Sequence, residues 1–247
     1  STYKFINDEQ QLLNFIDWLP ELEKEECYYV ALIARKKYDT NKVIKTNQTC
    51  IKRFISSKDH LFQSIRSLEV KYGTYKVNDK LLDESILSLY ILPNPRSFRK
   101  ASIQMAYNVL STLSTNEEFK NPKSIIMSEL SKHPNRKIFL DVDIDLNPDQ
   151  TLHIEELYIL LNDIINEESI VNIVQTRGGY HLLIKHDLIS HEFQKTYYKS
   201  ISNIKDERIK DVSIKGDRFL PIPGTIQGGF VPKMILHKKW INKKKNN

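Results

Sequence analysis

Residues 138–145 form an apolar run with alternating aspartates, Ile138-Phe139-Leu140-Asp141-Val142-Asp143-Ile144-Asp145. Side chains of a β-strand point alternately to its two faces, so the three aspartates share one face and the aliphatic residues share the other. Carboxylates crowded on an apolar strand repel one another, and partial burial then favours either protonation or a bound cation. Mg²⁺ prefers oxygen ligands and is usually held by one or two carboxylates plus substrate phosphates. The stretch therefore predicts a strand that carries a divalent-metal site.

Two alternatives for these aspartates stay open on the sequence alone. Asp145, Asn147, Asp149 and Glu156 match ligand positions of a calcium-binding EF-hand loop. That loop requires a glycine where Gln150 stands, and it follows a helix, whereas a strand precedes it here. The other alternative is a solvated acidic face that binds no metal, because two alternating aspartates are a weak signal by themselves.

The rest of the chain mixes strand-like and helix-like patterns. Short runs of β-branched and aromatic residues predict strands, and apolar residues at helical spacing predict helices. We expect strands at 27–34, 86–92, 137–145, 170–176, 180–185 and 218–222, and helices at 11–19, 59–69, 97–113, 152–166 and 190–204. Gly178 and Gly179 predict a tight antiparallel connection between two of these strands. The expected class is α+β or mixed α/β, rather than a doubly wound parallel fold.

Local signals predict where two of these elements end. Asn7 and Gln10 have the spacing of a capping box before the first helix. Pro93 and Pro95 follow the strand at 86–92 and are expected to end it, because proline cannot donate to a sheet ladder.

Charge is segregated along the chain, which has a formal net charge of +6. The segment 232–247 holds six lysines and no acid, and the segment 35–58 holds eight lysines or arginines against one acid, Asp39. Such segregation is typical of a protein with one side that faces a polyanion, although a solvated tail is an equal alternative for the terminal lysines. We divide the chain into an N-terminal α/β portion of the core or accessory layer (1–115), a part that carries the site motifs (116–232) and a basic tail (233–247).

Composition argues against several classes of protein. No run of about 18 apolar residues is present, so no membrane span is expected. The first ten residues are polar and acidic rather than a basic and then apolar leader, which favours a cytoplasmic location. The two cysteines, Cys27 and Cys50, form no CxxC pair, and we expect structural thiols rather than metal ligands.

Two further segments follow the aspartate strand. The first is a basic glycine turn that leads a histidine into a strand, Thr176-Arg177-Gly178-Gly179-Tyr180-His181. The second is Lys210-Asp211-Val212-Ser213, followed by Arg218 and the turn Pro223-Gly224-Thr225. His181 lies 38 residues after Asp143, and Asp211 lies 30 residues after His181. In this order and spacing, the segments resemble the three motifs of the archaeo-eukaryotic primase superfamily.

The resemblance covers about residues 138 to 225. In that family an apolar strand bears DxD or DxE, a small-residue turn ends in histidine, and an aspartate precedes an arginine and a PGS- or PGT-like turn. The stretch YILPNPRSFRK at 90–100 is also similar to phage primase-polymerases. One departure is Gly179, where the family often has a serine. Asp217 is a rival to Asp211, which we prefer because the family's aspartate lies further upstream of the proline-containing turn.

The resemblance implies a role for each matching residue. A carboxylate set would bind the catalytic metals, Mg²⁺ or Mn²⁺, and its members would be Asp141, Asp143 and Asp211. His181 would contact the phosphates of the incoming nucleotide, and Arg177 and Arg218 would add positive charge there. Phosphoryl transfer depends mainly on positioning and charge neutralisation, which such a set provides. The alternatives are a core histidine for His181 and an ordinary surface turn for Arg177.

The function implied by the resemblance is a template-dependent DNA primase-polymerase that joins nucleoside triphosphates, in the replication of a phage, plasmid or other mobile element. Its fold would be a catalytic core of mixed or antiparallel sheets flanked by helices. Its expected partners are a single-stranded DNA template, nucleoside triphosphates and a replicative helicase, fused or separate, and no membrane.

Two rivals stay open. A metal-dependent nuclease would use the same carboxylates and histidine, and a non-catalytic DNA-binding replication module would bind DNA with or without divalent metal. The basic segments are candidates for contact with template phosphates. Tyr28, Tyr29 and Tyr38 are candidates for stacking on bases, with core packing as the alternative for the first two.

Overall fold

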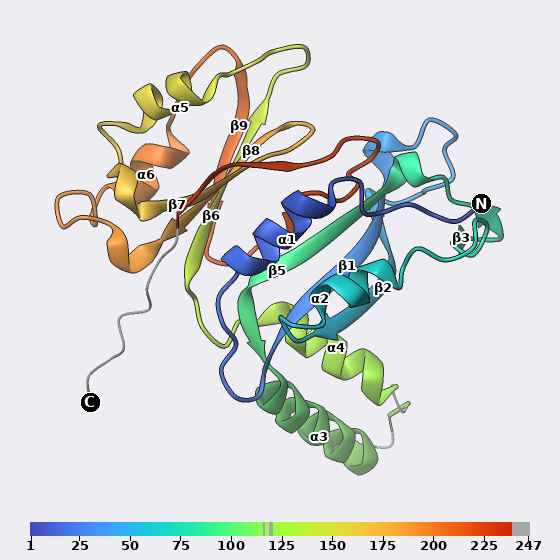
Figure 1. Ribbon diagram of the computed structural model, residues 1–247. Coiled ribbons are helices and arrows are strands. Elements are labelled where there is room, and N and C mark those ends of the chain that lie inside the picture. Colours follow the sequence, from blue (N-terminus) through green and yellow to red (C-terminus); the bar gives the residue numbers. More distant parts are fainter. Residues whose placement is uncertain (116, 119–120, 239–247) are drawn as a thin grey trace. The chain divides into compact units, whose positions relative to one another are not determined.

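The computed structural model describes residues 1–115, 117–118 and 121–238, and it has an α+β fold (Figure 1). Its strands form two larger antiparallel sheets and one small hairpin. The predicted α+β class with antiparallel pairing is confirmed.

The chain separates into two compact units, each made of two pieces of sequence. The first unit comprises Ser1–Lys137 and Asp217–Val231, and the second comprises Ile138–Gly216 and Pro232–Asn247. Residue 115, the end of the predicted N-terminal portion, lies inside the first unit. The predicted division into residues 1–115, 116–232 and 233–247 follows the sequence motifs rather than these two units. It stays a prediction.

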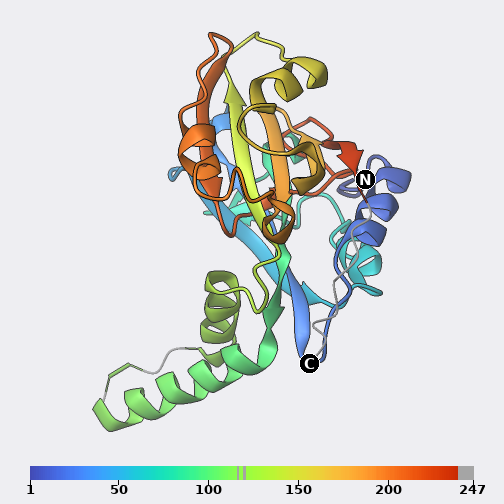
Figure 2. The same cartoon turned by 90° about the vertical axis from the view of Figure 1, so that its left-hand side faces the viewer.

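The second unit is built on a five-stranded sheet in the order β11-β7-β8-β6-β9 (Figure 2). Its strands are β6 (Phe139–Leu146), β7 (Ile170–Gln175), β8 (Gly179–Lys185), β9 (Ile209–Lys215) and β11 (Lys233–His237). The aspartate strand β6 therefore lies inside the sheet, with β8 on one side and β9 on the other. The helices α5 (Ile154–Leu161) and α6 (Tyr197–Ser202) belong to the same unit.

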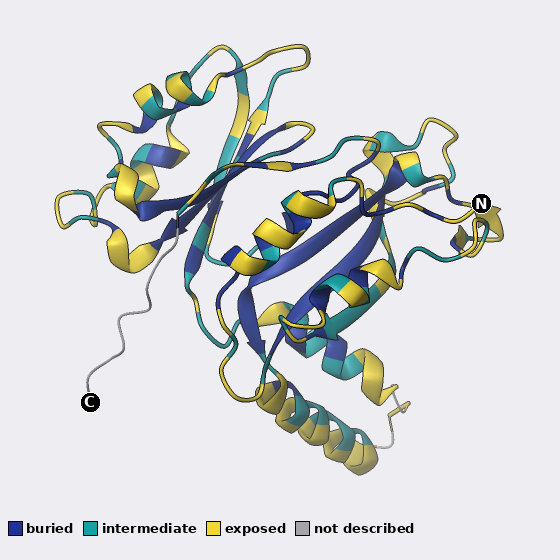
Figure 3. Cartoon of the chain, viewed as in Figure 1, coloured by how far each residue is buried: buried dark blue, intermediate teal, exposed yellow. Residues whose placement is uncertain are grey.

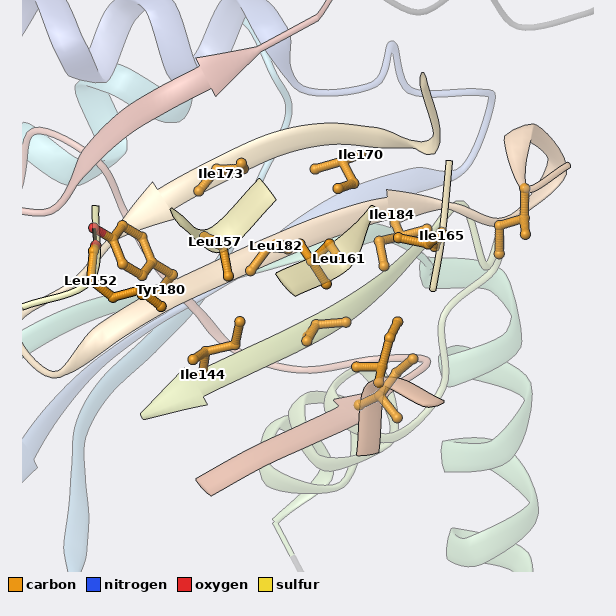
Figure 4. Close-up of a cluster of buried hydrophobic side chains, with 14 residues drawn as sticks. Ile144, Leu152, Leu157, Leu161, Ile165, Ile170, Ile173, Tyr180, Leu182 and Ile184 are labelled. Atoms are coloured by element: carbon orange, nitrogen blue, oxygen red, sulfur yellow. Dashed lines mark hydrogen bonds between the residues drawn. The ribbon is translucent and has the colours of Figure 1, made fainter. Parts of the chain in front are cut away.

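An apolar core covers one face of this sheet (Figure 4). Val142 and Ile144 of β6 and Leu182 of β8 are fully buried, and they cluster with Leu157 and Leu161 of α5. Because alternate residues of β6 face this core, the aspartates between them face the other way. The predicted two-faced strand is confirmed.

The first unit contains a four-stranded sheet in the order β10-β5-β1-β2. Its strands are β1 (Glu26–Arg35), β2 (Gln48–Ser56), β5 (Leu87–Ser97) and β10 (Leu220–Pro221), beside a small hairpin of β3 (Lys76–Val77) and β4 (Lys80–Leu81). Its helices are α1 (Glu9–Trp18), α2 (Leu61–Arg66), α3 (Phe98–Thr115) and α4 (Pro122–Lys132). Figures 1 and 2 show α1 and α2 on one face of the sheet and α4 on the other. Every residue of β1 between its two ends is accordingly buried.

The helix α3 buries little of its own surface (Figure 3). Ala101 is its buried residue, whereas Ile103, Tyr107, Leu110 and Leu113 are 61%, 67%, 66% and 65% exposed. Ile103, Tyr107 and Leu110 are spaced so that they share one side of the helix. An apolar stripe therefore lies on the surface of the first unit.

β5 continues through Pro93 and Pro95, so the predicted end of this strand is wrong. The pairing of β5 with β1 shifts register between Leu92 and Arg96, and the prolines lie in that irregular segment. Residues in a bulge do not form the regular hydrogen bonds of the sheet, so prolines there, which lack an N–H group, remove no hydrogen bond from it.

Helix ends also differ from the predictions. The helices predicted at 59–69, 152–166 and 190–204 are shortened to α2, α5 and α6. After α5, Ile165 is still buried in the core although it lies beyond the helix, so apolar spacing overestimates the helix length. At the start of α1 the cap is Asp8 rather than Asn7, since its Oδ1 accepts a hydrogen bond from the Gln11 amide at 3.1 Å.

The sequence patterns do not predict β2, α4, β9 or β11. β11 takes the first five residues of the predicted basic tail into the sheet of the second unit, where it pairs with β7. The tail lysines from Lys239 onward lie outside the described residues. Within the described part of the chain, none of the helices is long and apolar enough to cross a membrane.

Candidate active site

β6 holds its aspartates at graded depth on the face opposite the core. Asp141 is 2% exposed, the side chain of Asp143 is 28% exposed, and Asp145 is exposed near the end of the strand. A carboxylate as buried as Asp141 requires a compensating partner, because burial without one disfavours its charged form.

His181 supplies that partner. It lies directly opposite Asp143 in the pairing of β6 with β8. Its Nδ1 lies 2.9 Å from Oδ1 and 3.0 Å from Oδ2 of Asp141, and its Nε2 lies 3.4 Å from Oδ1 of Asp143. The hydrogen bond between Nδ1 and Asp141 satisfies the buried carboxylate and fixes the orientation of the ring. The structure thus brings three of the predicted site residues into contact.

The residue before the histidine points to the opposite face of the sheet. Tyr180 is buried in the apolar core, and its hydroxyl donates a hydrogen bond to the backbone oxygen of Leu152 at 2.6 Å. Figure 4 shows the ring of Tyr180 beside Leu152 within the core. His181 is therefore buried on the acidic face and not among the apolar side chains.

The glycine turn before β8 is held tightly against β6. A Cβ atom on Gly179 would lie 1.8 Å from the backbone oxygen of Ile144, so no other residue fits there without separating the strands. The backbone oxygen of Gly178 accepts a hydrogen bond from the Leu146 amide at 2.8 Å. This close approach accounts for the glycine at position 179, where the resemblance to primases would place a serine. Arg177 is exposed in this turn.

Asp211 of β9 lies on the same face of the sheet as the aspartates of β6, but it lies opposite Asp145 and not opposite Asp143. The residue pairs between β6 and β9 are Asp145 with Asp211, Asp143 with Ser213, and Asp141 with Lys215. Asp211 is exposed, and its direct neighbour is Asp145. Ser213 closes the predicted segment Lys210–Ser213, whereas no sequence motif includes Lys215. The alternation from Asp211 to Lys215 is a strand signal that could have found it.

An ion-pair network holds the start of β9 against α5. Nε of Arg208 lies 2.8 Å from Oδ1 of Asp206, and Nη1 of Arg208 lies 2.6 Å from Oε1 of Glu156. The hydrogen bonds from Arg208 lower the pKa of Asp206 to about 2. The backbone amide of Asn147 donates to the Arg208 oxygen at 2.8 Å, which ties the end of β6 to the start of β9. Glu156, the last ligand position of the EF-hand alternative, is thus bonded to Arg208.

Two further predicted residues belong to the first unit. Asp217, the rival third carboxylate, accepts hydrogen bonds from the fully buried Arg96, at 2.6 Å from Nη2 to Oδ2 and 3.2 Å from Nη1 to Oδ1. Asn94 also contacts Asp217, at 3.5 Å. The phage-like stretch at 90–100 therefore contributes a buried ion pair. Arg218 follows Asp217, in the same unit.

The PGT turn of the third motif is packed against the start of α1. Gly224 has φ +81°, and a Cβ atom on it would lie 2.3 Å from the backbone oxygen of Asp8. The Gly224 oxygen accepts hydrogen bonds from the amides of Asn7 and Asp8 at 2.9 and 3.0 Å. Within the first unit, this turn therefore holds the segment before α1 in place.

Asp141 and Asp143 are the carboxylates of β6 that could supply oxygen ligands to a divalent cation. Within residues 1–115, 117–118 and 121–238, no group of three or more histidine, cysteine, aspartate or glutamate side chains is arranged to hold a metal ion. Asp141 and Asp143 match the case in which one or two carboxylates bind Mg²⁺ and substrate phosphates with water supply the other ligands. If these two carboxylates bind a metal ion in this way, its affinity would depend on the nucleotide whose phosphates supply further ligands.

Two of the candidate stacking residues belong to the core of the first unit. Tyr28 and Tyr29 are 0% and 2% exposed on β1. Core packing, the alternative for these tyrosines, is confirmed. Tyr38 is half-buried just after β1.

No protein-family model, no curated protein and no solved structure matches this chain. The resemblance to primases therefore rests on the motif residues alone.

Proposed function

We propose that this chain is a metal-dependent nucleotidyltransferase of the archaeo-eukaryotic primase type, acting as a template-dependent DNA primase-polymerase. The observation that carries the proposal is the contact of His181 with both Asp141 and Asp143. It joins the residues of the first two motifs across adjacent strands of one sheet. Asp211, from the third motif, lies on the same face of that sheet.

Each of these residues has a distinct task in the proposed reaction. Asp141 and Asp143 would hold Mg²⁺ or Mn²⁺, which supplies positive charge at the nucleotide phosphates when bound. His181 keeps the buried Asp141 in a fixed orientation through Nδ1. Its Nε2 makes the longer contact, 3.4 Å to Asp143. Because Nδ1 donates to Asp141, Nε2 would donate to a nucleotide phosphate in the imidazolium form of the ring. Arg177, exposed beside β8, would add positive charge. The role of Arg218, which belongs to the first unit, rests on the resemblance alone.

The remaining parts of the proposal rest on the sequence resemblance. They are a single-stranded DNA template, nucleoside triphosphates as substrates, a replicative helicase as partner and a cytoplasmic role in the replication of a mobile element. A nuclease built on the same residues would cleave DNA without added nucleotide, and a binding module would be indifferent to divalent metal.

The decisive experiment is incorporation of labelled deoxynucleotides on a single-stranded template, with and without primer, in Mg²⁺ or Mn²⁺. Asp143→Asn should abolish incorporation. Asp149→Asn is the matched control, because Asp149 is exposed in the loop after β6 and its positive φ of 63° suits asparagine. Metal-dependent cleavage of the template in the absence of nucleotide would replace the proposal with the nuclease. Incorporation that survives Asp143→Asn would refute the proposed site.

A further inference from the structure

The loop between β1 and β2 exposes a cluster of lysines, which we call the basic hairpin. Its members Lys36, Lys37, Lys42 and Lys45 are all exposed. The one acid of this loop, Asp39, is occupied by the loop itself. Its two carboxylate oxygens accept hydrogen bonds from the backbone amides of Asn41, at 3.1 Å, and Ile44, at 2.6 Å. Asp39 is therefore held by the loop backbone, and the four lysines of the basic hairpin outnumber this one acid.

The loop is a packed structure, so its lysines project from a fixed base. Ile44 is 2% exposed, and the Lys36 amide donates to the Asn47 oxygen at 3.0 Å. The ring of Tyr38 lies against Gly228, where a Cβ atom would be 2.2 Å from Cδ2 of that ring. The base of the basic hairpin is therefore held by hydrogen bonds and packing within the first unit.

Cations and aromatic rings alternate at the base of the loop. The guanidinium of Arg35 lies 5.8 Å from the centre of the Tyr90 ring, and Nζ of Lys37 lies 5.1 Å from the centre of the Tyr38 ring. Cation–π contacts at these distances hold the side chains over the rings. Tyr90 is 6% exposed, so these rings pack at the base of the loop and leave the exposed lysines as the groups available to a ligand.

Another hairpin of the same unit has a different charge pattern. Between β3 and β4, Lys76 and Lys80 flank Asp79, and Asp83 follows closely. Alternating charges of both signs are typical of an ordinary solvated surface. Of these two hairpins, the β1–β2 loop is therefore the one with concentrated positive charge.

We propose that the basic hairpin binds single-stranded DNA through its phosphates. The partner follows from the chemistry: four exposed ammonium groups against the single acid of the loop suit a chain of phosphates, and such binding reads no base sequence. The choice of DNA among polyanions rests on the proposed function. The binding itself requires no chemistry at Asp141, Asp143 or His181.

The test compares two triple variants of the full chain. Lys37→Gln, Lys42→Gln and Lys45→Gln are combined in the hairpin variant, and Lys71→Gln, Lys76→Gln and Lys80→Gln are combined in the control, whose three lysines are also exposed. Both variants have the same reduction in net charge. Affinity for a labelled oligothymidylate is measured by anisotropy over a series of KCl concentrations. The hairpin variant should bind roughly ten- to a hundredfold more weakly at low salt, and its slope of log affinity against log salt should flatten by about 0.7 for each phosphate that a lysine no longer neutralises.

Several outcomes would overturn the inference. Equal weakening in both variants would mean that net charge, and not the hairpin, governs binding. Unchanged binding in the hairpin variant would remove the site. Vesicles of phosphatidylserine and phosphatidylcholine serve as the second probe, and loss of vesicle binding with intact DNA binding would assign the hairpin to membranes.

The inference and the proposed function fail separately. A wild-type chain that binds DNA through the hairpin but incorporates no nucleotide would leave the inference standing and remove the polymerase. If the wild-type chain incorporates nucleotide and both triple variants bind DNA normally, the polymerase would stand and the inference about the basic hairpin would fail.

Discussion

Nδ1 of His181 lies 2.9 Å from Oδ1 of the buried Asp141, although the two residues are 40 positions apart in the sequence. Asp143 is more exposed and contacts the other ring nitrogen at a longer distance. The two aspartates therefore share a proposed role in metal binding but differ in what they do for the folded chain.

Replacing either aspartate should abolish nucleotide incorporation with different effects on stability. Asp141→Ala should lower the free energy of unfolding by about 1–3 kcal/mol, because it leaves the buried imidazole without its acceptor. Asp143→Ala should leave stability near wild type or raise it, since it relieves repulsion between neighbouring carboxylates. Urea unfolding followed by circular dichroism measures both. Equal midpoints for the two variants would show that the His181–Asp141 bond contributes nothing in solution.

His181→Ala should lower the catalytic efficiency of nucleotide incorporation roughly ten- to a hundredfold. This range corresponds to a lost hydrogen bond to a charged group, about 1.5–3 kcal/mol. Tyr180→Phe is the control, because it removes a hydrogen bond on the opposite face of the same strand. That control should lose about 1 kcal/mol of stability and keep normal single-nucleotide kinetics. If His181→Ala behaves as Tyr180→Phe does, the histidine is structural and lies outside the site.

Gly179→Ala should destabilise the chain by about 3 kcal/mol or more, because its Cβ would meet the Ile144 oxygen and force β8 from β6. Gly216→Ala is the matched control in the same unit. Its Cβ would have its nearest neighbour, Cδ2 of Leu140, at 3.9 Å, which is ordinary contact. Thermal unfolding of both variants gives the comparison. A mild effect at Gly179 would mean that the two strands are further apart in solution.

Asp211→Asn and Asp217→Asn should separate the two candidates for the third carboxylate. Asp211 is exposed, so its substitution should leave the melting temperature unchanged and reduce incorporation if it assists the metal. Asp217→Asn should lower stability by about 3–5 kcal/mol, because Arg96 would remain buried without a counter-charge. Combining Asp217→Asn with Arg96→Met should recover part of that loss. Loss of incorporation by folded Asp217→Asn, with normal incorporation by Asp211→Asn, would reverse our assignment.

The ion pair between Glu26 and Arg136 should make stability depend on pH at the acidic end. Burial raises the pKa of Glu26, but the hydrogen bonds from Arg136 and Asn135 outweigh burial, so the pKa lies below its usual value. A carboxylate with a lowered pKa stabilises the fold above the pKa of the unfolded chain, and this stability is lost as the pH falls through the folded value. Glu26→Gln should therefore be less stable than wild type at pH 7, by about 1.5–3 kcal/mol, and the difference should shrink in strong acid. A difference that stays constant with pH would show that charge is not its cause.

Patterns that act within one element were predictable from the sequence. The alternation in β6, the hairpin at Gly178-Gly179 and the opposite faces of Tyr180 and His181 all follow from the period of a strand. β9 was missed because its exposed residues include Lys210 and Asp211, which weaken the apolar signal of a sheet-edge strand. Relations between distant residues could not be predicted. Nothing near Asp217 in the sequence indicates that its partner is Arg96, 121 residues earlier.

The return of the chain after residue 216 constrains how the protein can be made and dissected. β10 joins the sheet of the first unit only after the whole of 138–216 has been synthesised, and β11 then goes back to the second unit. On the ribosome, Arg96 emerges long before the carboxylate that will neutralise it. A fragment ending at residue 137 would lack β10 and Asp217, and one ending at residue 216 would also leave the outer edge of β7 uncovered. No single cut in the chain yields both units complete, so they have to be produced together or rejoined as a permuted chain.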